Sequence, residues 1–115
     1  IARGFAELQR FAKTYDAKPE TLVGLAGLGD LVLTASSLHS RNFAYGHDLG
    51  RGLSVTEAGG GKLAEGVFTA RILDQMAKAR GVDMPIVAAM AAILDGKLSV
   101  DAAVDVLMNR PLKSE

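Results

Sequence analysis

The chain contains no cysteine and no tryptophan, and its aromatic residues are two tyrosines and four phenylalanines. The absence of cysteine excludes a disulfide framework and a thiolate metal site. The two histidines, His39 and His47, lie eight residues apart, which does not bring two ligands together on one helix face. The sequence therefore predicts no metal site.

An excess of charge and a long apolar run are also missing. Thirteen Lys and Arg residues balance thirteen Asp and Glu residues, whereas a nucleic-acid-binding module usually carries a basic excess. A small anionic ligand needs only a few local donors and is not excluded. No apolar stretch approaches the roughly 20 residues of a membrane helix, and no secretory signal is visible. The 115 residues fit one domain, which we expect to be cytoplasmic.

What the sequence does contain is apolar residues at helical spacing along its whole length. The segments predicted to be helical are 1–15, 19–26, 29–37, 40–52, 63–81, 83–96 and 99–111. Two short apolar runs resemble strands, but neither has a partner, and an isolated strand leaves its backbone groups unsatisfied. We therefore expect an all-α fold, a compact bundle of about seven helices with short connections.

Local signals set the helix boundaries and the expected core. Pro19 and Pro85 suit first helical positions, Ser40 and Ser99 suit N-caps, and Gly81 suits a helix end. The apolar stripes expected to face the core are Ile1, Phe5, Leu8, Ala12 and Tyr15; Phe68, Ile72, Met76 and Ala79; Ile86, Ala89, Met90, Ile93 and Leu94; and Val100, Val104 and Leu107.

The beginning of the chain has an unusual pattern. Ile1 already belongs to the helical periodicity, and no Ser, Thr, Asp or Asn cap precedes it. We expect a fragment whose first helix begins upstream. A processed or tagged product remains the alternative.

Two glycine clusters resemble nucleotide-binding loops without matching them. The run GLAGLG at 24–29 follows a helical segment and has the spacing GxxGxG, whereas the dinucleotide fingerprint is GxGxxG between a strand and a helix. The run GGGK at 59–62 is followed by Leu63, where a P-loop has Ser or Thr. We interpret the second run as a flexible connector, which could still lie over a ligand.

Polar residues gather between 27 and 42, within otherwise apolar surroundings. Ser40, Arg41 and Asn42 would combine a helix N-terminus, a guanidinium fork and an amide, which suits a phosphate or a similar oxyanion. Asp30, at a predicted helix start, can accept hydrogen bonds from ligand hydroxyls, and Thr34 lies one turn along the same face. This set fits a polyol phosphate. Taken singly, each residue has a structural explanation: a helix-start acid, a cap and a surface arginine.

The runs GLAGLGDLVLTASSLHSRN and LAEGVFTARILDQMAKARGVDMPI resemble the bacterial NAD(P)-dependent glycerol-3-phosphate dehydrogenases, and the resemblance extends from the first helix through DMPI. It implies that residues 1–115 are the C-terminal helical substrate domain, of the 6-phosphogluconate-dehydrogenase-like kind, and that the N-terminal Rossmann domain is absent from this chain. The family interconverts sn-glycerol 3-phosphate and dihydroxyacetone phosphate with NAD or NADP and supplies glycerol 3-phosphate for phospholipid synthesis. The resemblance also suggests a homodimer.

The same resemblance assigns roles to individual residues. It implies substrate binding for Asp30, Thr34, Ser40, Arg41 and Asn42, and cofactor contacts for Arg41, Leu63 and Glu65. The family's general-base lysine, its second substrate-binding lysine and the GxGxxG loop would lie upstream of Ile1; Lys13 and Lys18 do not occupy the matching positions. We therefore expect no catalytic residue in this chain and no activity from it alone.

Two other interpretations stay open at this point. The chain could be a stand-alone helical interaction or phosphate-binding module. It could also be the helical domain of a different two-domain dehydrogenase that acts on another hydroxy acid, although Ser40, Arg41 and Asn42 favour a phosphate ligand. The choice between NAD and NADP is made by a Rossmann domain and cannot be read from these residues.

Overall fold

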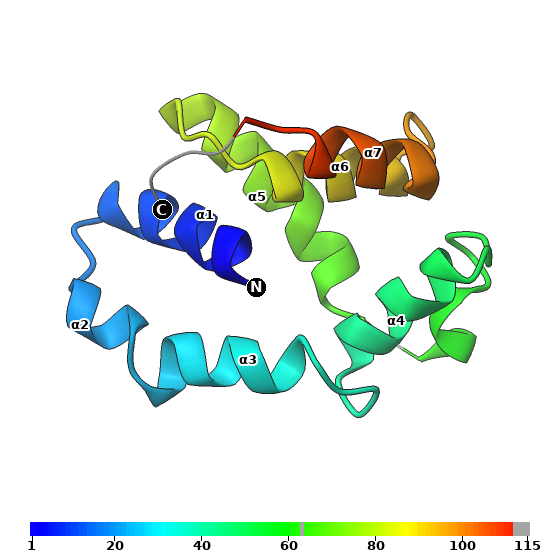
Figure 1. The fold of residues 1–115 in the computed structure, drawn as a ribbon, viewed down its shortest axis with the longest axis horizontal. Helices are drawn as coiled ribbons and strands as arrows, with labels where there is room; N and C mark the ends of the chain where they lie inside the picture. The colour runs from blue at the N-terminus through cyan, green and yellow to red at the C-terminus, as the bar shows by residue number, and fades with distance from the viewer. Residues whose placement is uncertain (63, 112–115) are drawn as a thin grey trace.

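The computed structural model describes residues 1–62 and 64–111, and all regular structure in these two ranges is helical (Figure 1). Its elements are α1 (Ala2–Lys13), α2 (Pro19–Leu22), the π-helical segment η1 (Leu25–Gly29), α3 (Asp30–Thr34), α4 (Arg41–Gly50), the 3-10 segment η2 (Ala58–Gly61), α5 (Gly66–Arg80), α6 (Pro85–Leu94) and α7 (Val100–Met108). The predicted all-α class and the expected number of about seven helices are confirmed. None of the helices in the described ranges is long and apolar enough to span a membrane.

The helices follow one another around the molecule in chain order (Figure 1). α2 and α3 run along one side, α4 and η2 form one end, and α5 crosses to the opposite side, where it packs against α6; α1 lies between the two sides. α6 packs against α7 and also against α1. Several predicted boundaries are confirmed: Pro19 and Pro85 begin α2 and α6, Ser99 caps α7, and Gly81 ends α5 in the left-handed conformation.

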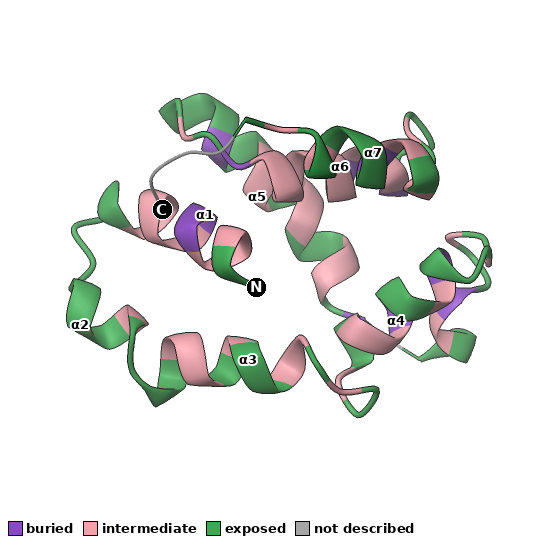
Figure 2. Ribbon diagram, in the orientation of Figure 1, coloured by how far each residue is buried: buried purple, intermediate pink, exposed green. Residues whose placement is uncertain are grey.

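Buried residues occupy short stretches of several helices (Figure 2), and most of them have small side chains. The buried hydrophobic residues are Ala6, Tyr45, Leu49, Ala58, Ala64, Ala77, Met84, Ala91, Leu94 and Ala103. Tyr45, the largest of them, donates its hydroxyl hydrogen to the carbonyl oxygen of Val55 at 2.7 Å. Alanine at helix contacts lets helix axes approach closely. The helices of this bundle therefore pack through close backbone approach more than through large apolar side chains.

The predicted core stripe of α5 is wrong. Phe68, Ile72 and Met76 are 60%, 57% and 37% exposed, and Ala79 is also exposed. The face that packs on α6 carries Ala77, which is 2% exposed. The pattern of large apolar residues selected the most hydrophobic face, whereas the small residue allows the closer helix contact.

A charged residue, Arg71 of α5, lies beside the α5–α6 contact, where its guanidinium group has partners at the end of α6. Its Nη2 donates to the carbonyl oxygen of Leu94 at 2.9 Å, and its Nε lies 2.8 Å from Asp95 Oδ1. Both partners belong to the C-terminal end of α6, where a cation also meets the negative end of the helix dipole.

Three further residues expected in the core are exposed. Ile1, Tyr15 and Val104 are 58%, 47% and 52% exposed. On α7 the buried position is Ala103, at 2%, so the small neighbour replaces the larger valine at the contact, as on α5. The stripe predicted for α6 is better placed, since Leu94 is buried and Ile86, Ala89, Met90 and Ile93 are partly buried.

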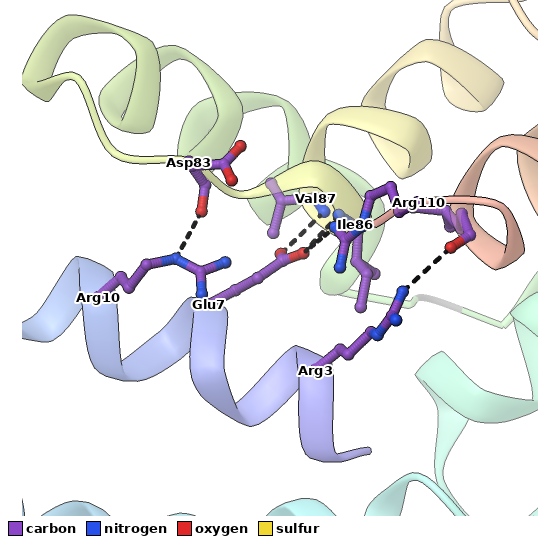
Figure 3. Close-up of polar contacts among 8 residues, drawn as sticks. Arg3, Glu7, Arg10, Asp83, Ile86, Val87 and Arg110 are labelled. Atoms are coloured by element: carbon purple, nitrogen blue, oxygen red, sulfur yellow. Dashed lines mark hydrogen bonds and ion pairs between the residues drawn. The ribbon is translucent and has the colours of Figure 1, made fainter. Parts of the chain in front are cut away.

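One buried carboxylate joins α1 to α6 (Figure 3). Glu7 is 2% exposed. It accepts a hydrogen bond from the backbone N–H of Ile86 at 2.5 Å and one from Val87 at 3.3 Å. These N–H groups lie in the first turn of α6, which has no intrahelical partner for them. Glu7 thus caps α6 from another helix, a role that the sequence analysis missed.

Arginines surround this carboxylate (Figure 3). Arg110 Nη1 lies 3.9 Å from Glu7 Oε1, and Arg10 Nε donates to the carbonyl oxygen of Asp83 at 2.9 Å. Arg3 donates to the carbonyl oxygen of Leu107 at 3.2 Å. Burial raises the pKa of Glu7 above its ordinary value of 4.5, while the two backbone hydrogen bonds and the charges of Arg10 and Arg110 oppose the rise.

Candidate anion-binding site

The start of α4 is organised by Ser40, as the sequence predicts. Ser40 has extended backbone angles and its Oγ accepts a hydrogen bond from the N–H of Phe43 at 3.3 Å. This arrangement is an N-cap, and it places Arg41 and Asn42 in the first turn, where backbone N–H groups and the helix dipole favour an anion. The local geometry of the Ser-Arg-Asn triplet therefore agrees with its prediction.

A cationic pocket opens beside this first turn. It has a volume of about 330 Å³ and is lined by Leu38, His39, Arg41, Ala44, Gly59 and Lys62. None of these lining residues carries a carboxylate. Across the described residues, neither the Arg41 nor the Lys62 side chain forms an ion pair. Two unpaired cations on one pocket attract an anion.

The glycine segment brings Lys62 to this pocket. Asp48, on α4, accepts a hydrogen bond from the N–H of Gly59 at 2.9 Å. Gly59 has a φ of 81°, and a Cβ there would lie 3.2 Å from Tyr45 Cδ2, so the close contact with α4 requires glycine. The connector expected at 59–62 is thus hydrogen-bonded to α4, and its last residue, Lys62, lines the same pocket as Arg41.

Lys62 and His39 are pocket residues that the sequence analysis did not select. For His39 the sequence favours an exposed or capping role over that of a metal ligand, and the residue is exposed in the structure. The described residues hold no group of three side chains that could bind a metal ion. Lys62 lies 21 positions from Arg41 in the sequence. The one available signal was the possibility that the GGGK run lies over a ligand.

Asn42 faces a different element. Its Oδ1 accepts a hydrogen bond from the N–H of Gly66, the first residue of α5, at 2.9 Å. Glu65, predicted to contact the cofactor, is exposed at the N-cap position of α5. Leu63, the other predicted cofactor contact, lies outside the described residues. Asn42 therefore links the predicted substrate triplet to the segment predicted for the cofactor.

The structure does not bring Asp30 and Thr34 into this pocket. Asp30 is exposed, and neither residue lines the hollow beside Arg41. The hydroxyl of Thr34 donates to the carbonyl oxygen of Asp30 at 2.8 Å. The two residues share a helix one turn apart, as predicted, but they form a group of their own on α3.

α3 begins at Asp30, as predicted, but the helical segment η1 leads directly into it. Gly29 has helical angles, with φ −59° and ψ −48°, and the Asp30 N–H donates to the carbonyl oxygens of Leu25 and Gly27. η1 and α3 therefore form one continuous helix, and its positive end lies near Leu25. A favourable interaction with the helix dipole does not explain an acid at position 30, because that effect falls off within the first turn.

The fold and this pocket define a class: an all-helical domain with cationic side chains gathered at a helix start. Residues 1–105 match the model of the family described as NAD-dependent glycerol-3-phosphate dehydrogenase C-terminus. The chain belongs to this family. The resemblance found in the sequence is confirmed.

Curated relatives extend this finding. The chain is 60% identical to the glycerol-3-phosphate dehydrogenase [NAD(P)+] of Methylobacterium radiotolerans, over all of this chain and 35% of that protein. It is 58% identical to the enzyme of the same name from Rhodopseudomonas palustris, over 98% of this chain and 34% of that protein. The crystal structure of glycerol-3-phosphate dehydrogenase from Coxiella burnetii matches with a TM-score of 0.90 and 37% identity, covering 95% of this chain and 34% of that one. The chain thus spans about a third of these relatives.

Proposed function

We propose that residues 1–115 form the C-terminal domain of a glycerol-3-phosphate dehydrogenase, in which a cofactor-binding domain precedes them. The complete enzyme interconverts sn-glycerol 3-phosphate and dihydroxyacetone phosphate with NAD or NADP. The observation that carries the proposal is the cationic pocket at the start of α4, because it gathers Arg41 and Lys62 without a lining carboxylate in a chain of this family. A phosphate monoester matches this charge and these donors.

Each proposed site residue has a defined task. Arg41, with the first turn of α4 and the Asn42 amide, binds the phosphate of the substrate, and Ser40 holds that turn in place. The exposed carboxylate of Asp30 accepts hydrogen bonds from the glycerol hydroxyls or orients the general-base lysine, and Thr34 lies beside it. Arg41, Leu63 and Glu65 contact the cofactor. The nicotinamide supplies hydride transfer, and the base that takes the hydroxyl proton is a lysine of the preceding part of the enzyme.

Replacing Arg41 by alanine is expected to raise the KM for glycerol 3-phosphate about 30-fold, which corresponds to about 2 kcal/mol for a lost charged contact. Arg41→Lys should recover only part of this loss, because an ammonium group lacks the guanidinium fork. Steady-state kinetics of the complete enzyme measures both. Arg51→Ala is the matched control, since Arg51 follows the far end of α4 and its exposed side chain lies 3.9 Å from the partly buried Asp48 carboxylate. An unchanged KM in Arg41→Ala would exclude the phosphate role.

The 115-residue chain alone is expected to show no dehydrogenase activity. Hydride transfer requires the cofactor and the substrate to be held in contact, and the proposed enzyme divides these tasks between two domains. A titration of the chain with sn-glycerol 3-phosphate should still shift the amide resonances around Ser40, with weak affinity. Turnover by this chain alone would contradict the division of tasks. Absence of any shift would favour a stand-alone module without this ligand.

We also propose the assembly and setting that the family resemblance implies. The complete enzyme is a cytoplasmic homodimer that supplies glycerol 3-phosphate for phospholipid synthesis. Light scattering on the purified enzyme tests the dimer.

A further inference from the structure

The contact between α4 and α5 at Asn42 gives Gly66 a task of its own. Gly66 is the first residue of α5, and the N-cap residue Glu65 supplies no side-chain cap. The Gly66 N–H has no partner within the helix and donates instead to Asn42 Oδ1 at 2.9 Å. An amide of α4 thus satisfies an N–H group of α5 across 24 positions of sequence.

This hydrogen bond fixes which way the Asn42 amide points. A backbone N–H can be bonded only by the oxygen of a side-chain amide, not by its NH2 group. The Asn42 oxygen is therefore held on Gly66, and its Nδ2 remains as the donor side. A phosphate accepts hydrogen bonds and is repelled by a carbonyl oxygen, so only this orientation of the amide suits a phosphate ligand.

The Asn42 side chain can approach Gly66 closely only because residue 66 has no side chain. A Cβ at this position would lie 2.9 Å from Asn42 Oδ1 and 3.1 Å from Asn42 Cγ. The backbone there is helical with a negative φ, so conformation does not demand glycine. Glycine at position 66 is explained by the approach of Asn42.

We propose that Gly66 is a positioning residue for the substrate: it holds the Asn42 amide with its NH2 group available to the phosphate of glycerol 3-phosphate. The inference rests on the proposed function for the identity of the ligand. It also joins two segments of the site, because Asn42 belongs to the proposed substrate triplet and Gly66 follows the proposed cofactor contact Glu65. One hydrogen bond thereby sets the relative placement of both segments.

The test compares alanine variants of the complete enzyme. Gly66→Ala is expected to raise the KM for glycerol 3-phosphate about tenfold, the effect of losing one hydrogen bond to a charged group, with a smaller change in kcat. The unfolding midpoint should not fall, because alanine is the better helix former. Gly50→Ala is the matched control: Gly50 is also helical, and a Cβ there meets nothing within 4 Å.

Two further variants separate positioning from a general structural effect. Asn42→Asp keeps an oxygen for the Gly66 N–H but removes the NH2 donors, and it should raise KM at least as much as Gly66→Ala. In an Asn42→Ala background, Gly66→Ala should add no further increase, because the group that it positions is gone. On the 115-residue chain, Asn42→Ala should accelerate hydrogen exchange of the Gly66 N–H, which reports the bond without any activity.

The outcomes are distinguishable. If the unaltered enzyme does not oxidise glycerol 3-phosphate, the proposed function fails. If it does, and Gly66→Ala has the same KM as Gly50→Ala, the positioning role is overturned. A further tenfold increase on adding Gly66→Ala to Asn42→Ala, or unchanged exchange of the Gly66 N–H in Asn42→Ala, would also overturn it. Non-additive effects on KM together with faster exchange would support it.

Discussion

Replacing Gly27 by alanine is expected to destabilise the chain by about 3 kcal/mol or more, the upper end of the range for overpacking. A Cβ at Gly27 would lie 2.1 Å from the carbonyl oxygen of Leu22 and 2.7 Å from its carbonyl carbon. Both are backbone atoms, so no side-chain rotation relieves the overlap. The π-helical segment η1 would have to move away from the end of α2. Urea unfolding of the 115-residue chain, followed by circular dichroism, measures the loss.

Gly29→Ala is the matched control in the same GLAGLG run. Its Cβ would make only ordinary van der Waals contacts, at 3.4 Å from Leu25 Cδ2 and 3.7 Å from the carbonyl oxygen of Gly24, and Gly29 already has helical angles. This substitution should leave stability unchanged or raise it by up to about 1 kcal/mol, through helix propensity. Equal effects of the two substitutions would show that the close approach at Gly27 does not limit the fold.

Replacing Glu7 by alanine is the second large effect, and we expect a loss of about 3–5 kcal/mol, typical of breaking a buried charged contact. The substitution leaves the N–H groups of Ile86 and Val87 without their acceptor and removes the carboxylate near Arg110. It also removes the hydrogen bonds that join α1 to the first turn of α6. The same urea unfolding experiment measures it, and wild-type stability of Glu7→Ala would contradict the capping role.

Glu7→Gln distinguishes the hydrogen bonds from the charge. Glutamine keeps an oxygen for the N–H of Ile86, so the loss should be smaller than with alanine. Burial raises the folded-state pKa of Glu7 above 4.5, which means that the folded chain binds this proton more tightly than the unfolded chain. Its linked contribution to stability is complete below pH 4.5 and is lost as the pH rises through the folded-state pKa. Glu7→Gln should remove this part of the pH dependence; an unchanged profile would exclude Glu7 as its source.

Sequence reasoning succeeded where a local signal determines the structure. Ser40, Ser99, Pro85 and Gly81 lie at helix ends as predicted, because capping depends on a few consecutive residues. It failed on which face of α5 is buried, since apolar periodicity cannot tell whether large residues or a small one such as Ala77 will meet the neighbouring helix. The start of α3 at Asp30 agrees with the prediction, but the sequence did not reveal that η1 runs into it without a break, through the helical angles of Gly29.

The candidate site likewise has a part that local sequence predicts and a part that only the fold brings together. Ser40 and Arg41 are neighbours in sequence, and the Ser40 cap begins the helix whose first residue, Arg41, lines the pocket. His39 precedes Ser40 directly in the sequence, whereas Lys62 reaches the pocket through the contact of the glycine segment with α4, and Gly66 reaches Asn42 through the contact of α5 with α4. The Gly59–Asp48 hydrogen bond, which places Lys62, has no local signature. Such distant pairings follow from the packed fold, and a single sequence does not reveal them.

The π-helical turn at Leu25–Gly29 has a consequence for how this segment can change over evolutionary time. A π turn holds about one residue more than an α turn. Deleting one residue from it would restore an ordinary α turn. Because an α turn and the longer π turn both complete about one revolution, everything that follows would keep nearly the same direction around the helix axis. The direction in which the Asp30 side chain leaves the helix is therefore tolerant of a one-residue deletion in this turn, and such a deletion would change the length of the segment without reorienting the carboxylate.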